Sequence, residues 1–144
     1  MTPAEHAALE VLATFESGQH DRVHDLVTAD FVDHGAPAGL PPGPDGYIAV
    51  LRYLTEVLQI RYEVHDVLAA GDRVAIRATA HGIHNTSLVG APTGKPYAMA
   101  TMHLYRADGD RLAEHWGVRD EYGVLVQVGA LPVPRLPADL LSGR

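Results

Sequence analysis

The stretch that decides the fold is RLAEHWGVRDEYGVLVQVGAL, residues 111–131. It predicts a strand that ends in an acid and is followed at once by a short apolar helix. If the strand alternates regularly, two carboxylates share a face with an indole ring. A carboxylate beside a large apolar ring is partly desolvated, which raises its pKa and suits it to proton transfer near neutral pH. The simpler interpretation is a solvent-facing pair of acids around a core tryptophan. The face in question carries Leu112, Glu114, Trp116, Val118 and Asp120.

Length and composition restrict the class of protein. With 144 residues, 47% of them hydrophobic, the chain is expected to form one domain over 1–131 and a proline-rich, irregular tail over 132–144. The absence of cysteine excludes disulfides, thiol nucleophiles and cysteine-based metal sites. A net charge of −7 with a single lysine argues against nucleic acids and anionic membranes as partners. No apolar run reaches the length of a membrane-spanning helix, so we expect a cytoplasmic protein.

Three helices are expected in the N-terminal part of the chain. Residues 2–5, TPAE, form a capping box, and apolar residues then recur at helical spacing over 3–17. A short second helix is expected over 21–26. The third runs from about 44 to 58 and follows the proline- and glycine-rich loop at 35–44.

The apolar period changes to that of a strand near residue 59. Helices followed by antiparallel strands define an α+β fold. Long, curved strands covered by helices on one side leave a concave surface that the helices and the proline-rich loop close into an apolar pocket. A loop is expected over 85–95. The four predicted strands cover 60–68, 73–83, 97–107 and 111–120.

The third of these strands has one face rich in polar and aromatic groups and another rich in alanine. Either face could form the pocket wall. The first face carries Tyr97, Met99, Thr101, His103 and Tyr105, and the second carries Ala98, Ala100, Met102 and Leu104. Nine histidines invite a metal hypothesis, but the helical i, i+4 spacing of zinc enzymes is absent, and no metal site is expected.

Four stretches together resemble the SnoaL-like polyketide cyclases, a family of the nuclear transport factor 2-like superfamily. The resemblance covers roughly residues 8–131. It rests on FVDH at 31–34, PDGY at 44–47, TAHG at 79–82 with GAPTGK at 90–95, and RADGDRLAEHW at 106–116 with the later Asp120 and QVGA at 127–130.

This resemblance implies a cone-shaped, cystatin-like α+β barrel, in which a curved antiparallel sheet and three N-terminal helices enclose a pocket. It also implies a cofactor-free intramolecular aldol condensation that closes a ring of an aromatic polyketide, typically an ester. The acid of the family's W-x-x-x-D motif is the general acid/base, which here is Asp120. Histidines near the cavity assist substrate binding, and His34 and His103 stand at such positions.

The predicted catalytic residues are therefore Asp120 and His34, although Asp120 could instead cap the helix that follows it and His34 could be a surface residue. The predicted substrate-binding residues are His103, Trp116, Tyr47, His81, Met99 and Thr101.

Two other functions stay open at this point. The first is an epoxide hydrolase or isomerase on the same fold, which would need an Asp-Arg-Asp constellation with Arg77 or Arg119. The second is a non-catalytic small-molecule-binding module, since fold does not fix function. A homodimer or homotetramer is expected, because the sheet face away from the pocket needs cover.

Overall fold

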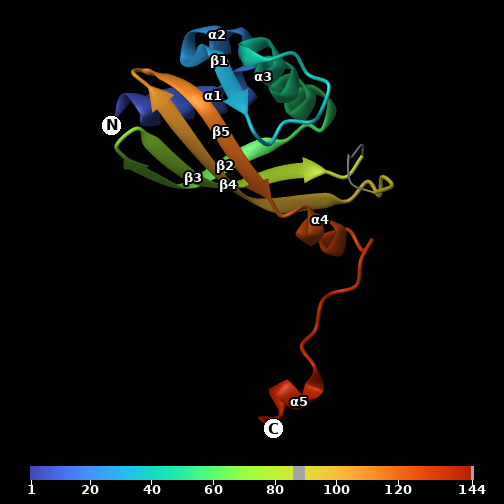
Figure 1. Cartoon of the computed structure of the whole chain (residues 1–144). Coiled ribbons are helices and arrows are strands. Elements are labelled where there is room, and N and C mark those ends of the chain that lie inside the picture. The colour runs from blue at the N-terminus through green and yellow to red at the C-terminus, as the bar shows by residue number, and fades with distance from the viewer. Residues whose placement is uncertain (86–89, 144) are drawn as a thin grey trace.

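Strands β2 to β5 form a continuous antiparallel meander, and the short strand β1 is added at its edge (Figure 1). The computed structural model describes residues 1–85 and 90–143, so part of the predicted loop at 85–95, residues 86–89, lies outside the described residues. The strand order is β1-β5-β4-β3-β2, and the fold is α+β as predicted. The strands are β1 (Val27–Asp33), β2 (Arg61–Ala70), β3 (Arg73–Ile83), β4 (Pro96–Asp108) and β5 (Arg111–Arg119).

Among the described strands, the one departure from an antiparallel sheet is the pairing of β1 with β5, which is parallel. Asp33 is the register partner of His115, and the amide of His34 continues the ladder by donating to the carbonyl oxygen of His115 at 2.9 Å. The curved sheet is therefore mixed and unclosed, with β1 and β2 as its edges. The pattern of residues 31–34 is too short to have indicated this pairing.

The first helix follows the predicted boundaries because its signals are local. α1 (Pro3–Ser17) begins after Thr2, whose hydroxyl oxygen accepts a hydrogen bond from the Glu5 amide at 3.1 Å, and ends at Gly18 in the left-handed conformation with φ 71°. The second predicted helix is a 3₁₀ turn, η1 (His20–Arg22), followed by α2 (Val23–Leu26).

The predicted third helix is α3 (Gly43–Arg52), extended by a π-helical turn, η2 (Tyr53–Val57). α4 (Glu121–Gln127) follows β5. The tail, expected to be irregular, contains a short helix, α5 (Ala138–Leu141), and extends away from the rest of the chain (Figure 1). Within the described parts of the chain, no helix has both the length and the apolar character needed to cross a membrane.

Helices α1 to α3 cover one face of the sheet and bury the core there (Figure 1). Val11 of α1, Leu51 of α3 and Ile76 of β3 meet in this layer and are at most 3% exposed. The opposite face is open, with Met102 51% and Val118 72% exposed. On β4 the face with Met99, Thr101, His103 and Tyr105 is therefore the inner one, which settles the alternative that the sequence leaves open.

The predicted face of β5 is wrong because the strand contains a β-bulge. Arg106 pairs with Glu114 and Ala107 pairs with Leu112, so Ala113 is an extra residue without a partner. Leu112 is fully buried, whereas Glu114 and the residues that alternate with it, Trp116 and Val118, lie on the outer face. The bulge instead turns His115 towards the core.

Gly46 of α3 packs against the proline-rich loop, where a Cβ atom would overlap the carbonyl oxygen of Pro41. We expect Gly46→Ala to destabilise the fold by about 1–3 kcal/mol, although alanine favours a helix, because backbone atoms cannot move aside cheaply. Urea unfolding measures the effect. The matched control is Gly35→Ala, whose Cβ would meet its nearest atom at an ordinary 3.5 Å. Equal stability of both variants would contradict this packing.

Candidate functional site

An apolar cavity of about 410 Å³ lies between α3, η2, β4 and α4. A second, polar recess of about 20 Å³ lies deeper under the sheet, with room for about one water-sized group. Val50, Leu54 and Arg119 line both spaces. The arrangement is that of a binding site with apolar walls and a few converging polar groups at one end.

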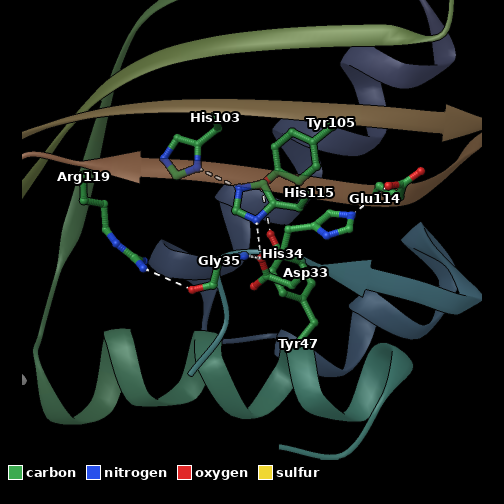
Figure 2. Close-up of polar contacts among 9 residues, drawn as sticks. All are labelled: Asp33, His34, Gly35, Tyr47, His103, Tyr105, Glu114, His115 and Arg119. Atoms are coloured by element: carbon green, nitrogen blue, oxygen red, sulfur yellow. Dashed lines mark hydrogen bonds and ion pairs between the residues drawn. The ribbon is translucent and has the colours of Figure 1, made fainter. Parts of the chain in front are cut away.

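A chain of buried hydrogen bonds at the recess runs across four strands, and Figure 2 shows its part from Asp33 to His103. His115 Nδ1 lies 2.9 Å from Asp33 Oδ1, and His115 Nε2 lies 2.9 Å from His103 Nδ1. His103 Nε2 lies 3.1 Å from the Thr101 hydroxyl, which donates to the carbonyl oxygen of Ala78 at 2.8 Å. The side chains of Asp33 and His115 are each only 9% exposed.

The direction of each hydrogen bond in this chain assigns the protons. Because the Thr101 hydroxyl gives its proton to a carbonyl, its oxygen accepts from His103 Nε2. His103 Nδ1 then accepts from His115 Nε2, and His115 Nδ1 donates to the carboxylate of Asp33. His115 thus donates from both ring nitrogens and is an imidazolium, whereas His103 is neutral.

The electrostatics of the recess agree with this assignment. Burial, reinforced by the charges of His115 and Arg119, lowers the pKa of His103 to about 3. Burial raises the pKa of Asp33, but the hydrogen bond and charge of His115 outweigh it, and the net shift is downward. Burial also raises the pKa of Tyr62 to about 12, so its phenol stays protonated.

Two aromatic rings stack on His115 and hold it in place. It stacks on His103 with ring centroids 5.2 Å apart and on Tyr105 with centroids 4.5 Å apart. The Tyr105 hydroxyl is 2.9 Å from that of Tyr47, and burial raises the pKa of both phenols. These contacts fix the orientation of the imidazolium relative to the recess.

Arg119, the last residue of β5, stands where the two spaces meet. Its Nη2 donates to the carbonyl oxygen of Gly35 at 3.4 Å (Figure 2). Its Nε is 3.8 Å from Glu121 Oε1. Its side chain is 27% exposed. Arg77, the other arginine considered from the sequence, lies outside and donates to Asp66 at 2.6 Å.

Four of the predicted site residues gather at this site. Tyr47 and His103 line the recess, and Met99 lines the apolar cavity. Thr101 is 2% exposed and holds His103.

Three predicted site residues lie elsewhere. His34 stacks on Trp116 with ring centroids 4.8 Å apart and bonds Glu114 Oε2 at 2.7 Å, and it is absent from the residues that line the cavity or the recess. His81 bonds Glu63 at 3.3 Å on the outer face of β3. For Trp116 the reason is the bulge in β5, which places its ring on the outer face, and for His81 it is the alternation of β3.

Asp120 has the geometry of a helix cap. Its Oδ1 accepts from the Gly123 amide at 2.8 Å, and the residue is exposed at the start of α4. It is absent from the residues that line either space. The capping interpretation that the sequence leaves open therefore describes this carboxylate in the structure.

Motifs and spacing do not indicate that Asp33 and His115 belong to the site, or that Arg119 lies where the cavity and the recess meet. Asp33 stands two residues after the buried Phe31 in the same short strand, which is a signal that both face inwards. His115 alternates with Asp120 along the predicted strand, but the sequence does not show that the face with His115 is the inner one. Among the described residues no group of three or more potential ligands could hold a metal ion.

The chain belongs to the SnoaL-like polyketide cyclase family, because the family model matches residues 5–128. This confirms the resemblance found in the sequence. No curated protein sequence matches the chain.

Solved structures of this kind share the fold. IdmH from Streptomyces antibioticus, provisionally assigned as a polyketide cyclase, is 28% identical, with a TM-score of 0.74 over 90% of this chain and 99% of that chain. A SnoaL-like polyketide cyclase from Agrobacterium tumefaciens is 18% identical, with a TM-score of 0.77 over 90% of this chain and 100% of that one. AclR from Streptomyces galilaeus, provisionally assigned as a hydroxylase, is 22% identical, with a TM-score of 0.72 over 98% and 93% of the two chains. The last two show likeness of fold alone.

The buried His103 should make stability depend on pH. The pKa of His103 is about 3 in the folded chain and 6.5, its ordinary value, in the unfolded chain. The unfolded chain therefore binds more protons between these two pH values. Stability is fully present above the higher value and falls as the pH drops towards the lower one. His103→Gln, which keeps a donor and an acceptor, should remove up to about 1.4 kcal/mol per pH unit of this slope.

Urea unfolding of the parent and the His103→Gln variant through this pH window measures the difference. The range above the ordinary pKa of Asp33, 3.8, is the informative one, because the carboxylate stays ionised there. Identical slopes for the two proteins would show that His103 is not held neutral by the fold.

Proposed function

We propose that this protein catalyses a cofactor-free intramolecular aldol ring closure of an aromatic polyketide ester. The observation that carries the proposal is the hydrogen-bonded chain Asp33–His115–His103 at the polar end of an apolar cavity. Membership of the SnoaL-like polyketide cyclase family supports the class of reaction. Flat aromatic rings suit the apolar walls, and carbonyl groups suit the polar recess.

The histidine pair serves as the acid and the base. In the acid form the two imidazole rings together carry one extra proton, and the carboxylate of Asp33 balances its positive charge. His103 exchanges its bond to the Thr101 hydroxyl for one to a carbonyl oxygen of the substrate, and its Nε2 passes a proton to that oxygen as its Nδ1 takes one from His115, which leaves the pair neutral. The pair then removes a proton from the carbon flanked by carbonyls. The enol attacks a second carbonyl of the same molecule, forming the carbon–carbon bond. The pair protonates the new alkoxide, and the enol oxygen returns its proton as its carbonyl re-forms.

Asp120 is the competing candidate for the acid/base, on the strength of the family motif. Its exposure and its bond to the Gly123 amide favour a capping role instead. We therefore assign the proton transfers to the buried chain and use Asp120 as the discriminating control.

Asp33→Asn and His103→Gln should each lower the turnover of an anthracycline-type precursor ester by about a hundredfold or more, the usual scale for losing a general acid or base. Asp120→Asn should retain turnover close to that of the parent. Chromatography of stopped reactions measures ring closure, and thermal unfolding confirms that each variant is folded.

The pattern of losses separates the alternatives. If Asp120→Asn is inactive while Asp33→Asn turns over normally, the acid/base is Asp120 and the buried chain is structural. Absence of turnover by the parent on a panel of such esters, with binding retained, would identify a binding module.

One observation favours the hydrolase alternative as a second candidate. Asp33 and Arg119 line a recess with room for about one water, which is part of an Asp-Arg-Asp constellation. Glu121, which lines only the larger cavity, is the nearest candidate for the other acid. Hydrolysis of an aryl epoxide by the parent, lost in Asp33→Asn, would support this reaction over ring closure.

We also propose that the protein is a homodimer or homotetramer that uses the outer face of the sheet. Met102 and Val118 are register partners on β4 and β5 and are 51% and 72% exposed. Apolar side chains that are adjacent in this way lose unfavourable contact with water when a second copy covers them.

Val118→Glu should convert the assembly to monomers, because it would bury charges at the interface. Sedimentation equilibrium at micromolar concentration measures the mass. The control is Val133→Glu in the tail, at a position that is 63% exposed, which should leave the mass unchanged. A monomeric parent would refute the proposal.

A further inference from the structure

Arg119 is the one cationic side chain among the described residues that line the apolar cavity. A guanidinium group has five N–H donors. In the described chain its only hydrogen bond is the long one to Gly35 at 3.4 Å, and its ion pair with Glu121 spans 3.8 Å. Most of its donors are therefore available to a ligand.

The charged groups around Arg119 leave its guanidinium as the net positive charge at the neck, the place where the cavity and the recess meet. Asp33 is occupied by His115, which balances its charge. Glu121 is half exposed, so water screens its charge. The other residues that line both spaces are Val50 and Leu54, whose apolar surfaces strengthen the field of the guanidinium.

We propose that Arg119 is an oxyanion-binding residue, so that the cavity takes flat, apolar ring systems that carry a conjugated oxyanion. The rings would occupy the 410 Å³ cavity and the anionic oxygen would face Arg119. A planar guanidinium matches a carboxylate with two parallel hydrogen bonds. This proposal narrows the class of substrate. It rests on the proposed function only for the reaction that follows binding, because a binding measurement alone tests it.

Two sources can supply such an oxyanion, a carboxylate and a phenolate or enolate. Calorimetric titration with anthraquinone-2-carboxylate tests the first, and titration with 2-hydroxyanthraquinone, above the pKa of its phenol, tests the second. The methyl ester of the carboxylate is the neutral probe of the same shape. We expect the parent to bind at least one anion about tenfold or more tightly than the ester, the scale of a hydrogen bond to a charged group.

Arg119→Gln should remove this preference, lowering affinity for the anion about tenfold while changing affinity for the ester little. Glu121→Gln should raise the affinity for the anion, because it removes a negative charge beside the guanidinium of Arg119 and frees that group from its ion pair. Arg77→Gln is the matched control. It removes one positive charge from an outer pair with Asp66 and should change neither affinity.

Equal losses for the anion and the ester in Arg119→Gln would show that Arg119 only shapes the cavity. Failure of the parent to prefer either anion over the ester would also overturn the proposal. If Arg119→Gln does not fold, the Glu121→Gln variant still tests the proposal. Unchanged affinity of that variant for the anion would count against binding of the anion at Arg119. Preference for the anion without turnover would refute the proposed reaction and leave this site standing.

Discussion

The contact between Asp33 and His115 is the constraint from which the site is built. A carboxylate with 9% exposure is stable only with a partner, and the parallel pairing of β1 with β5 puts an imidazole opposite it. Because the Thr101 hydroxyl donates to Ala78, His103 donates to Thr101 and His115 donates to both His103 and Asp33. The ion pair of Asp33 and His115 then holds the charged end of this chain between two strands.

This arrangement also explains how charge is tolerated beside an apolar cavity. The carboxylate and the imidazolium cancel, so the buried chain has no net charge, and each ring nitrogen along it has a partner. In a region of low dielectric constant, a small movement of one proton then changes the field at the recess strongly. Arg119 stands outside this neutral pair, and its long contacts with Gly35 and Glu121 leave most of its donors available where the cavity and the recess meet.

The parts of the structure that depend on local signals could be predicted from the sequence. α1 follows its capping box and glycine stop, and β3 matches the predicted 73–83, because alternation and turns are properties of neighbouring residues. The inner face of β4 depends on which side the helices cover, and the face of β5 depends on the bulge at Ala113. Asp33 joins the site through a pairing across 82 residues, which no local pattern encodes.

Gly117 shows how a residue without a side chain defines this site. It is the register partner of His103, and a Cβ atom there would lie 3.1 Å from His115 Cε1 and 3.6 Å from His103 Nδ1. The two imidazoles can stack under β5 because this position is empty. A chain could keep every hydrogen-bonding residue of the recess and still lose the geometry by gaining a single side chain at 117. Proteins with this fold can therefore diverge in activity through a substitution at a residue that has no reactive group. The sequence motif of the site would not reveal such a change.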